Sequence, residues 1–128
     1  RIKFAPKVSF QDHINRHSVV DLFLDTYPYN AHTSSSDAVW AGCPVLTLTG
    51  ETFASRVAGS ILKEVGCEML ITRNEDEYYQ KALALSNDSA QLNNVREMVL
   101  RGKKNSSLFK TPNFIKKLEN VYLGLLQK

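Results

Sequence analysis

The chain has 128 residues, a formal net charge of +3 and a hydrophobic content of 43%. That length is enough for one domain with a buried core and too short for two full domains. The mixed charges are typical of a soluble globular protein, and the small positive excess is far from the dense basic face of a nucleic-acid-binding protein. No apolar run approaches the roughly 20 residues of a membrane-spanning helix, and no signal peptide opens the chain. We therefore expect neither nucleic acid nor a membrane among its partners.

Short strand-like runs alternate with helical patterns over the first 72 residues. The runs predicted as strands are nearly continuous in apolar residues, which is typical of a parallel sheet covered by helices on both faces. In the last predicted helix of this part, four apolar residues recur every four positions and so share one face. The sequence therefore predicts an α/β fold with a Rossmann-like parallel sheet. The expected elements are strand 2–4, helix 12–17, strand 20–24, helix 35–41, strand 44–48, helix 53–65, with Gly66 at its C′ position, and strand 69–71.

The last third of the chain has a different, helical character. The segment from Asn74 to Glu77 opens one helix with three acidic residues, where the helix dipole favours negative charge. A second helix is expected over residues 89–100, followed by a polar break at 102–107. Thr111 and Pro112 then offer an N-cap and a first helical residue for a last helix. We expect a single domain with an α/β core over residues 1–72 and structural closing helices over 73–128.

The start of the chain and its two cysteines bear on its context. Arg1 leads directly into the predicted strand 2–4 without an initiating methionine, so we expect that the sequence was cut from a longer protein. Cys43 and Cys67 are isolated in apolar surroundings, and we interpret them as buried, reduced thiols rather than a disulfide. Reduced cysteines favour a cytoplasmic protein, which would also be nuclear if the source is a eukaryote.

The segment from Asn30 to Asp37 is the strongest functional signal. It joins a predicted buried strand to a helix, and hydroxyl side chains crowd the start of that helix. The first N–H groups of a helix have no partner within it, so such a segment is suited to bind phosphate. His32 stands at the mouth of this site, and Asp37 could accept hydrogen bonds from ribose hydroxyls. A simple helix cap, with His32 as an ordinary loop residue, is the structural alternative.

Other chemistries have little support. The chain has neither a Gly-x-Gly-x-x-Gly motif nor a Walker lysine loop, and its cysteines and histidines lack metal-ligand spacing. Asp25 ends an apolar strand, as a phosphoacceptor does in a receiver domain. However, the first predicted strand ends without the acidic pair that would hold magnesium. We expect no metal and no cofactor.

Six motifs in order give the chain a family resemblance. Together they resemble the C-terminal catalytic lobe of protein O-GlcNAc transferases, the O-GlcNAc transferase/SPINDLY-like family. The Trp-Ala-Gly-x-Pro motif and the motif that begins Gly-Glu-Thr-Phe are the most specific of the six. The matching segments are 1–6, 12–16, 24–26, 30–34, 37–45 and 50–57.

The resemblance implies a GT-B glycosyltransferase with two Rossmann-like lobes and the donor between them. Such enzymes transfer N-acetylglucosamine from UDP-GlcNAc to serine or threonine hydroxyls of acceptor proteins, with inversion and without a metal. The resemblance further implies that the uracil base lies against one histidine and two backbone groups, that the diphosphate is held at the helix start, and that the ribose is held by a carboxylate. By motif match these residues are His13 with Val8 and Arg16 for the base, His32, Thr33 and Ser34 for the diphosphate, and Asp37 for the ribose, with His32 as the catalytic residue.

The chain departs from the family pattern in two places. Phe10 stands where animal relatives carry a lysine, which puts one ribose or phosphate contact in doubt, and Lys7 is a possible substitute. Ser34 replaces the second threonine of a Thr-Thr pair, a mild change. The family's acceptor lobe and tetratricopeptide array would precede Arg1, so we expect these residues alone to lack transferase activity. Two alternatives stay open. The protein could be a related glycosyltransferase that uses UDP-glucose or GDP-fucose as its donor, or a non-catalytic interaction module.

Overall fold

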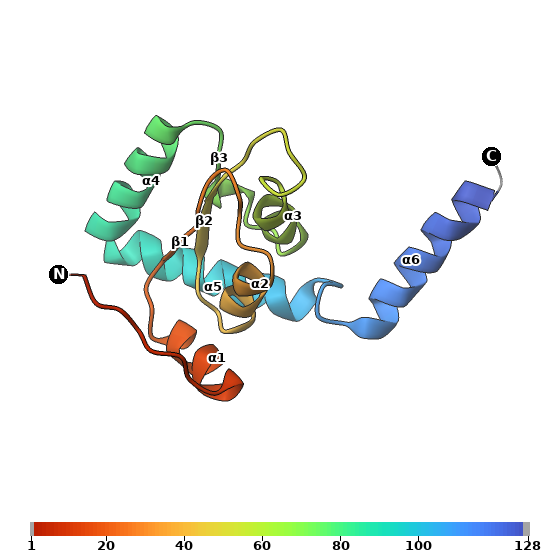
Figure 1. Ribbon diagram of the computed structural model, residues 1–128, viewed down its shortest axis with the longest axis horizontal. Coiled ribbons are helices and arrows are strands. Elements are labelled where there is room, and N and C mark those ends of the chain that lie inside the picture. The colour runs from red at the N-terminus through yellow and green to blue at the C-terminus, as the bar shows by residue number, and fades with distance from the viewer. Residues whose placement is uncertain (1, 127–128) are drawn as a thin grey trace.

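The computed structural model describes residues 2–126, which form a three-stranded sheet and six α-helices (Figure 1). The sheet is parallel, with strand order β1-β2-β3. A single 3₁₀ turn precedes the third strand. In chain order the elements are α1 Phe10–Ser18, β1 Phe23–Leu24, α2 Thr33–Trp40, β2 Val45–Leu48, α3 Val57–Glu64, the 3₁₀ turn Glu68–Leu70, β3 Ile71–Thr72, α4 Glu75–Asn87, α5 Ser89–Asn105 and α6 Thr111–Leu126.

The central strand β2 is the best-buried element of the sheet. All four of its residues are buried, and its register pairs Val45 with Phe23 of β1 and Thr47 with Ile71 of β3. β-branched and aliphatic side chains fit a strand that is covered on both sides. The strand therefore anchors the sheet, and the loops after β1, β2 and β3 meet at one edge of it.

Helices cover both faces of this sheet. Figure 1 shows α4 on one side of the strands and α3 on the other, while α5 runs beneath them. Both α3 and α4 contact β2, and α5 contacts α2 and α4. The apolar side chains of these layers form one core that reaches from Ala38 of α2 to Val99 of α5. The predicted Rossmann-like α/β fold is thus confirmed.

The prediction of a strand at residues 2–4 is wrong. Ile2 and Phe4 have no strand conformation, and their exposed fractions are 87% and 94%. A strand needs a neighbour for its N–H and C=O groups. Within residues 2–126, the pairing of strands involves only β1, β2 and β3. Apolar composition alone therefore did not make this segment part of the sheet.

Several predicted boundaries also move. The strand predicted over 20–24 is short and comprises Phe23 and Leu24, and 68–70 is a 3₁₀ turn with the strand after it. The helix predicted from Phe53 begins at Val57, because Thr52 and Ser55 form a hydrogen-bonded turn before it. Gly66 ends α3 with a φ of 71°, as predicted.

The polar break predicted at 102–107 is wrong over its first part, because α5 continues to Asn105. The glycine inside this helix has a packing role. A Cβ at Gly102 would lie 1.9 Å from the carbonyl oxygen of Val65. Glycine here permits a close approach of two backbones rather than ending a helix.

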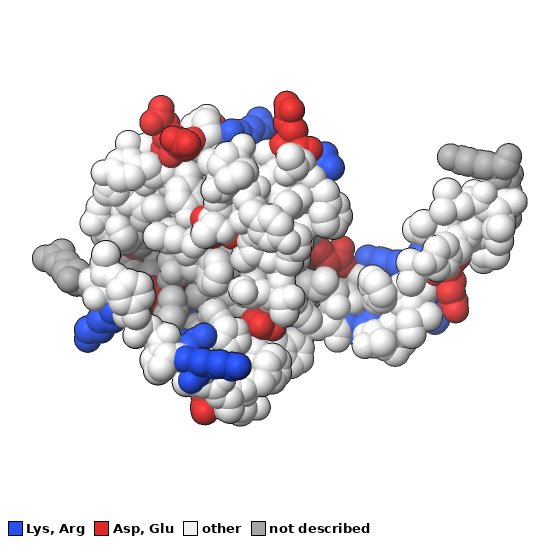
Figure 2. All heavy atoms as spheres, viewed as in Figure 1, with Lys and Arg blue, Asp and Glu red and all other residues white. Residues whose placement is uncertain are grey.

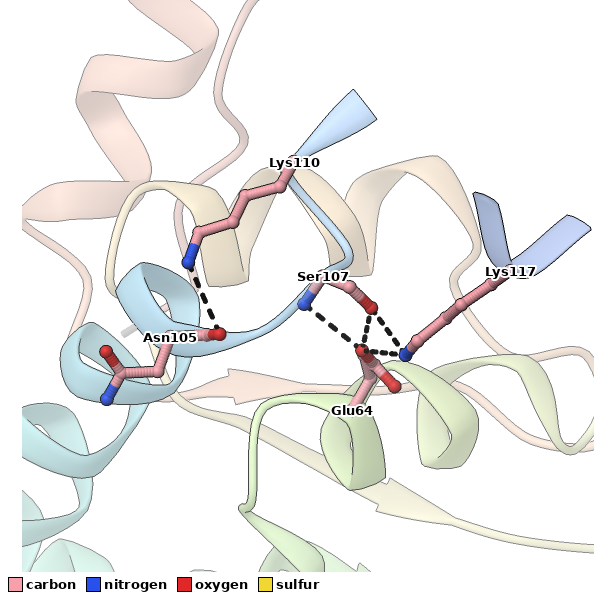
Figure 3. Close-up of polar contacts among 5 residues, drawn as sticks. All are labelled: Glu64, Asn105, Ser107, Lys110 and Lys117. Carbon is pink, nitrogen blue, oxygen red and sulfur yellow. Dashed lines mark hydrogen bonds and ion pairs between the residues drawn. The ribbon is translucent and has the colours of Figure 1, made fainter. Parts of the chain in front are cut away.

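The last helix, α6, extends away from the rest of the chain (Figure 1). None of its described residues is buried, and its large apolar side chains are exposed, with exposed fractions of 53% at Phe114 and 58% at Tyr122. Its tie to the body is an exposed network at Glu64, whose carboxylate accepts from the backbone N–H and hydroxyl of Ser107 and from the Lys117 ammonium (Figure 3). These bonds lower the pKa of Glu64, chiefly through the hydroxyl of Ser107.

Two surface features complete the description. Acidic and basic side chains are interspersed on the face seen in Figure 2, and much of that face is uncharged. Over the described residues, no helix combines the length and apolar character needed to cross a membrane.

Candidate functional site

The loop between β1 and α2 is built around the buried carboxylate of Asp25. One oxygen of Asp25 accepts from the backbone N–H groups of Thr26 and Ala31, at 2.8 and 2.7 Å. The other accepts from the hydroxyl of Thr47 on β2 at 2.6 Å. Only 6% of Asp25 is exposed. The residue therefore holds the loop together and is not placed to act as a phosphoacceptor.

Asn30 fixes the far end of the same loop. Its side-chain amide donates to the carbonyl oxygens of Thr26 at 2.9 Å and Leu48 at 3.2 Å. The hydroxyl of Tyr78 on α4 donates to the carbonyl oxygen of Asp25 at 3.0 Å, and burial raises the pKa of this tyrosine. Bonds to β2 and α4 thus fix the chain just before α2.

The N-terminus of α2 keeps free donors. No side chain caps the helix. The backbone N–H of Ser36 donates to the carbonyl oxygen of His32, the N-cap residue, at 3.1 Å. Thr33 and Ser34 are exposed at the helix start. The alternative that this hydroxyl cluster merely caps the helix is not supported, because no side chain makes the capping bond. Such uncapped N–H groups are the donors that an anion site would use, and the anion site predicted from the sequence stays a prediction.

Two aromatic rings fix the imidazole of His32. The ring of Tyr29 stacks on it with centroids 4.9 Å apart and an interplanar angle of 16°. The ring of Phe53 meets it edge-on at 6.1 Å. This stack could not be predicted from local patterns, because they place Tyr29 in a loop and Phe53 at the start of a helix. Both rings restrict the plane of the imidazole.

Buried polar atoms without a partner gather at this helix start. Among the described residues, four buried side-chain nitrogen or oxygen atoms lack a hydrogen-bond partner, and three of them lie within residues 30–35. They are Asn30 Oδ1, His32 Nε2 and Ser35 Oγ. An unsatisfied buried group costs about 1–3 kcal/mol. Such a concentration indicates a site whose polar groups are completed by a ligand or water.

A second cluster joins α1 to α2. His13 Nε2 lies 3.4 Å from Asp37 Oδ2. Arg16 Nη2 donates to His13 Nδ1 at 2.6 Å, and its Nη1 donates to the carbonyl oxygen of Pro6 at 3.3 Å. Thr33 and Asp37 are four residues apart on α2 and share a face of that helix. The structure therefore brings together predicted base, ribose and diphosphate residues on the same pair of helices.

His17 is the buried member of this cluster. Its exposed fraction is 8%, its ring lies edge-on to His13 at 4.7 Å, and its other side packs near Phe23 of β1 at 6.0 Å. His17 is therefore a buried residue of α1 and not a surface one. The available signal was the spacing of four residues from His13, which places both on one face of a helix.

The remaining predicted positions lie at the exposed N-terminal part of the chain. Val8 is 39% exposed and precedes α1, and Phe10 opens α1 with 71% exposed. Lys7 is exposed as well. Within the described residues, the side chain of Lys7 makes no hydrogen bond to the cluster around His13, and the contact predicted for Val8 is one of its backbone. Their predicted roles stay predictions.

Metal and thiol chemistry find no support at this site. Within residues 2–126, no group of three His, Cys, Asp or Glu side chains could hold a metal ion. Cys43 and Cys67 are free and buried, as predicted. Burial raises the pKa of Cys43 to about 11, so its thiol stays protonated and unreactive at neutral pH.

A family model named for glycosyl transferase family 41 matches residues 1–118. The chain belongs to glycosyl transferase family 41. Two curated relatives match along its full length at 34% identity. They are the probable UDP-N-acetylglucosamine–peptide N-acetylglucosaminyltransferase SPINDLY of Solanum lycopersicum and the UDP-N-acetylglucosamine–peptide N-acetylglucosaminyltransferase of Caenorhabditis elegans. The chain spans 14% and 11% of the length of these relatives, respectively.

A solved structure supports the same assignment. The chain is similar to a mutant of the O-GlcNAc transferase of Thermobaculum terrenum, with a TM-score of 0.83 and 34% identity. The match covers 90% of this family 41 chain and 22% of that protein. The resemblance noted in the sequence motifs is therefore confirmed at the level of family and fold.

Proposed function

We propose that this chain forms the UDP-binding part of a family 41 protein N-acetylglucosaminyltransferase. In this proposal, the full-length protein transfers N-acetylglucosamine from UDP-GlcNAc to serine or threonine hydroxyls of protein acceptors. The names of the relatives support the donor and the peptide acceptor. No metal and no cofactor take part, and the anomeric centre is inverted.

One observation carries the proposal. Three buried polar atoms without partners belong to residues 30–35, the segment that leads into the uncapped start of α2. A nucleotide diphosphate supplies oxygen acceptors for helix N–H groups and for an imidazole donor. The adjacent His13 and Asp37 offer a ring for the base and a carboxylate for ribose hydroxyls.

The proposed mechanism is electrostatic. As the sugar–phosphate bond breaks, negative charge grows on the departing UDP. His32, together with the N–H and hydroxyl groups of Thr33 and Ser34, would stabilise that charge. Such groups are effective because they are already oriented before the reaction. Tyr29 and Phe53 support this role by holding the His32 imidazole in one plane.

The test separates the nitrogen of His32 from the packing of its ring. The His32→Phe variant keeps an aromatic ring between Tyr29 and Phe53 but removes the donor. We expect UDP affinity, measured by calorimetry in the longest natural form, to fall about 10- to 100-fold, the range for a hydrogen bond to a charged group. Ser86→Ala, on the far helix α4, is the control and should bind UDP normally. Unchanged UDP binding in His32→Phe would refute the proposed role of the imidazole.

The donor sugar is tested separately. Incubation of the longest natural form with an acceptor protein and UDP-GlcNAc, UDP-glucose or GDP-fucose is followed by intact mass measurement of the acceptor. We expect a gain of one N-acetylhexosamine with UDP-GlcNAc only. A hexose or deoxyhexose would change the assigned donor, whereas no gain with any donor would favour the non-catalytic alternative.

A further inference from the structure

The two histidines of α1 meet in a hydrogen bond, and His17 is not among the residues assigned to the donor. His13 Nε2 and His17 Nε2 are 3.3 Å apart in hydrogen-bonding geometry, and the rings are perpendicular. The same His13 nitrogen also faces Asp37 Oδ2 at 3.4 Å. The position of the protons on the two imidazoles therefore decides whether the Asp37 carboxylate accepts from His13 or is open to accept from a ligand.

The neighbouring arginine decides the protonation of His13. A guanidinium has only donors, and Arg16 Nη2 lies 2.6 Å from His13 Nδ1. His13 Nδ1 must therefore be an acceptor without a proton. Neutral His13 then carries its proton on Nε2 and donates it to His17 Nε2, so the proton of His17 resides on Nδ1.

The surroundings of His17 keep it an acceptor. Its ring projects from α1 and is buried beside the apolar ring of Phe23 on β1. The charged and titratable groups facing it are His13 and Arg16 from α1 and Asp37 from α2. Burial lowers the pKa of His17, the two basic neighbours lower it further, and Asp37 opposes them. A second proton on His17 would point an N–H at the N–H of His13.

We propose that His17 is a positioning residue of the donor site, which accepts the Nε2 proton of His13 and so fixes that ring's tautomer and orientation. Because the proton of His13 is directed to His17, the carboxylate of Asp37 keeps its accepting capacity for the hydroxyls of a ligand. This inference rests on the proposed function, in which His13 lies against the base and Asp37 holds the ribose.

The first test reads the tautomers directly and needs no ligand. The chain contains three histidines, so ¹⁵N-histidine labelling gives a small set of imidazole signals. Two-bond ¹H–¹⁵N spectra at pH 7.5 should show His13 as the Nε2–H form and His17 as the Nδ1–H form. His13 found as the Nδ1–H form, or His17 found as the cation with protons on both nitrogens at this pH, would overturn the assignment.

The second test uses two substitutions of His17 with different chemistry. His17→Leu keeps an apolar contact with Phe23 but removes the acceptor, and His17→Gln returns an oxygen acceptor at a similar reach. In the longest natural form, we expect His17→Leu to weaken UDP binding about five- to tenfold, the effect of one lost hydrogen bond. His17→Gln should restore most of the affinity. Phe23→Leu is the control, because it alters the same packing without touching the hydrogen bond.

The outcomes separate this inference from the proposed function. If wild-type protein does not bind UDP, the proposed function fails, and the imidazole spectra still decide the tautomers. If wild-type protein binds UDP and folded His17→Leu binds it equally well, the positioning role is refuted while the proposed function stands. A loss of affinity in Phe23→Leu equal to that in His17→Leu would also refute it, because packing alone would then explain the effect. Should His17→Leu fail to fold, the comparison of His17→Gln with wild type at pH 7.5 decides, since His17→Gln must keep most of the affinity and leave the tautomer of His13 unchanged.

Discussion

The loop before α2 and the helix α6 are tied to the body of the protein in opposite ways. The loop is fixed from within by Asp25 and Asn30, whose side chains are buried and bonded to backbone groups of neighbouring elements. Helix α6 is tied from outside by Glu64, Ser107 and Lys117, with the pair Glu64–Lys117 exposed to 36% and 64%. Buried bonds to backbone groups cannot be replaced by water, whereas exposed ones can. Of the two regions, only the loop before α2 is therefore held firmly enough to position the groups of a binding site.

The largest expected effect comes from breaking the buried side of this comparison. Asp25→Ala leaves the N–H groups of Thr26 and Ala31 and the hydroxyl of Thr47 without their acceptor. We expect a loss of about 4 kcal/mol in the free energy of unfolding, measured in urea. Asp21→Ala, at an exposed aspartate before β1, is the matched control and should change it by less than about 0.5 kcal/mol. A small effect of Asp25→Ala would mean that the loop is held by other bonds.

A pair of glycines sharpens the contrast between the body and α6. The Cβ of Gly102→Ala would collide with the carbonyl of Val65, and we expect a loss of about 3 kcal/mol. Nothing lies within 4 Å of a Cβ at Gly124 in α6. Gly124→Ala should therefore raise stability slightly, by about 0.5–1 kcal/mol if the helix unfolds with the body. Thermal unfolding of both variants measures this, and a loss of stability in Gly124→Ala would show that α6 is packed more tightly than in this structure.

The buried imidazole of His17 should make the free energy of unfolding depend on pH. The pKa of His17 is lowered in the folded state, so its contribution is fully present above the unfolded value of about 6.5. It is lost as the pH falls from there through the folded pKa, because the unfolded chain binds the proton more readily. We expect a slope of at most about 1.4 kcal/mol per pH unit in this window. Urea unfolding between pH 7.5 and 5 should show a shallower slope for His17→Leu, and equal slopes would contradict the prediction.

Local patterns predicted the parts of the molecule that depend on local interactions. The continuous apolar run of β2 and the hydroxyl-rich start of α2 are both visible within a few residues, and both are found in the structure. The strand predicted at 2–4 failed because a strand depends on a distant neighbour. Gly102 was misread because its reason is the approach of Val65, 37 positions before it in the chain.

The same distinction holds for the candidate site. His13, His32 and Asp37 were selected from motifs, and the structure places His13 and Asp37 in contact. The burial of His17 was missed because it depends on Phe23 in another element. The stack of Tyr29 on His32 was missed because it depends on the path of the loop, which Asp25 and distant Thr47 determine together.

The smallest expected effect comes from the exposed side of the comparison. Glu64→Gln removes the charge that Ser107 and Lys117 share, but water can replace these bonds (Figure 3). We expect a change of at most about 0.5 kcal/mol in the free energy of unfolding and none in UDP affinity. Because the pKa of Glu64 is lowered in the folded state, this small contribution is present above the unfolded value of about 4.3 and is lost as the pH falls through the folded pKa. Glu68→Gln, at an exposed glutamate outside the network, is the control in calorimetry and urea unfolding at pH 7. If Glu64→Gln lowered UDP affinity, the tether of α6 and the start of α2 would be coupled, and the separation of the two regions would be wrong.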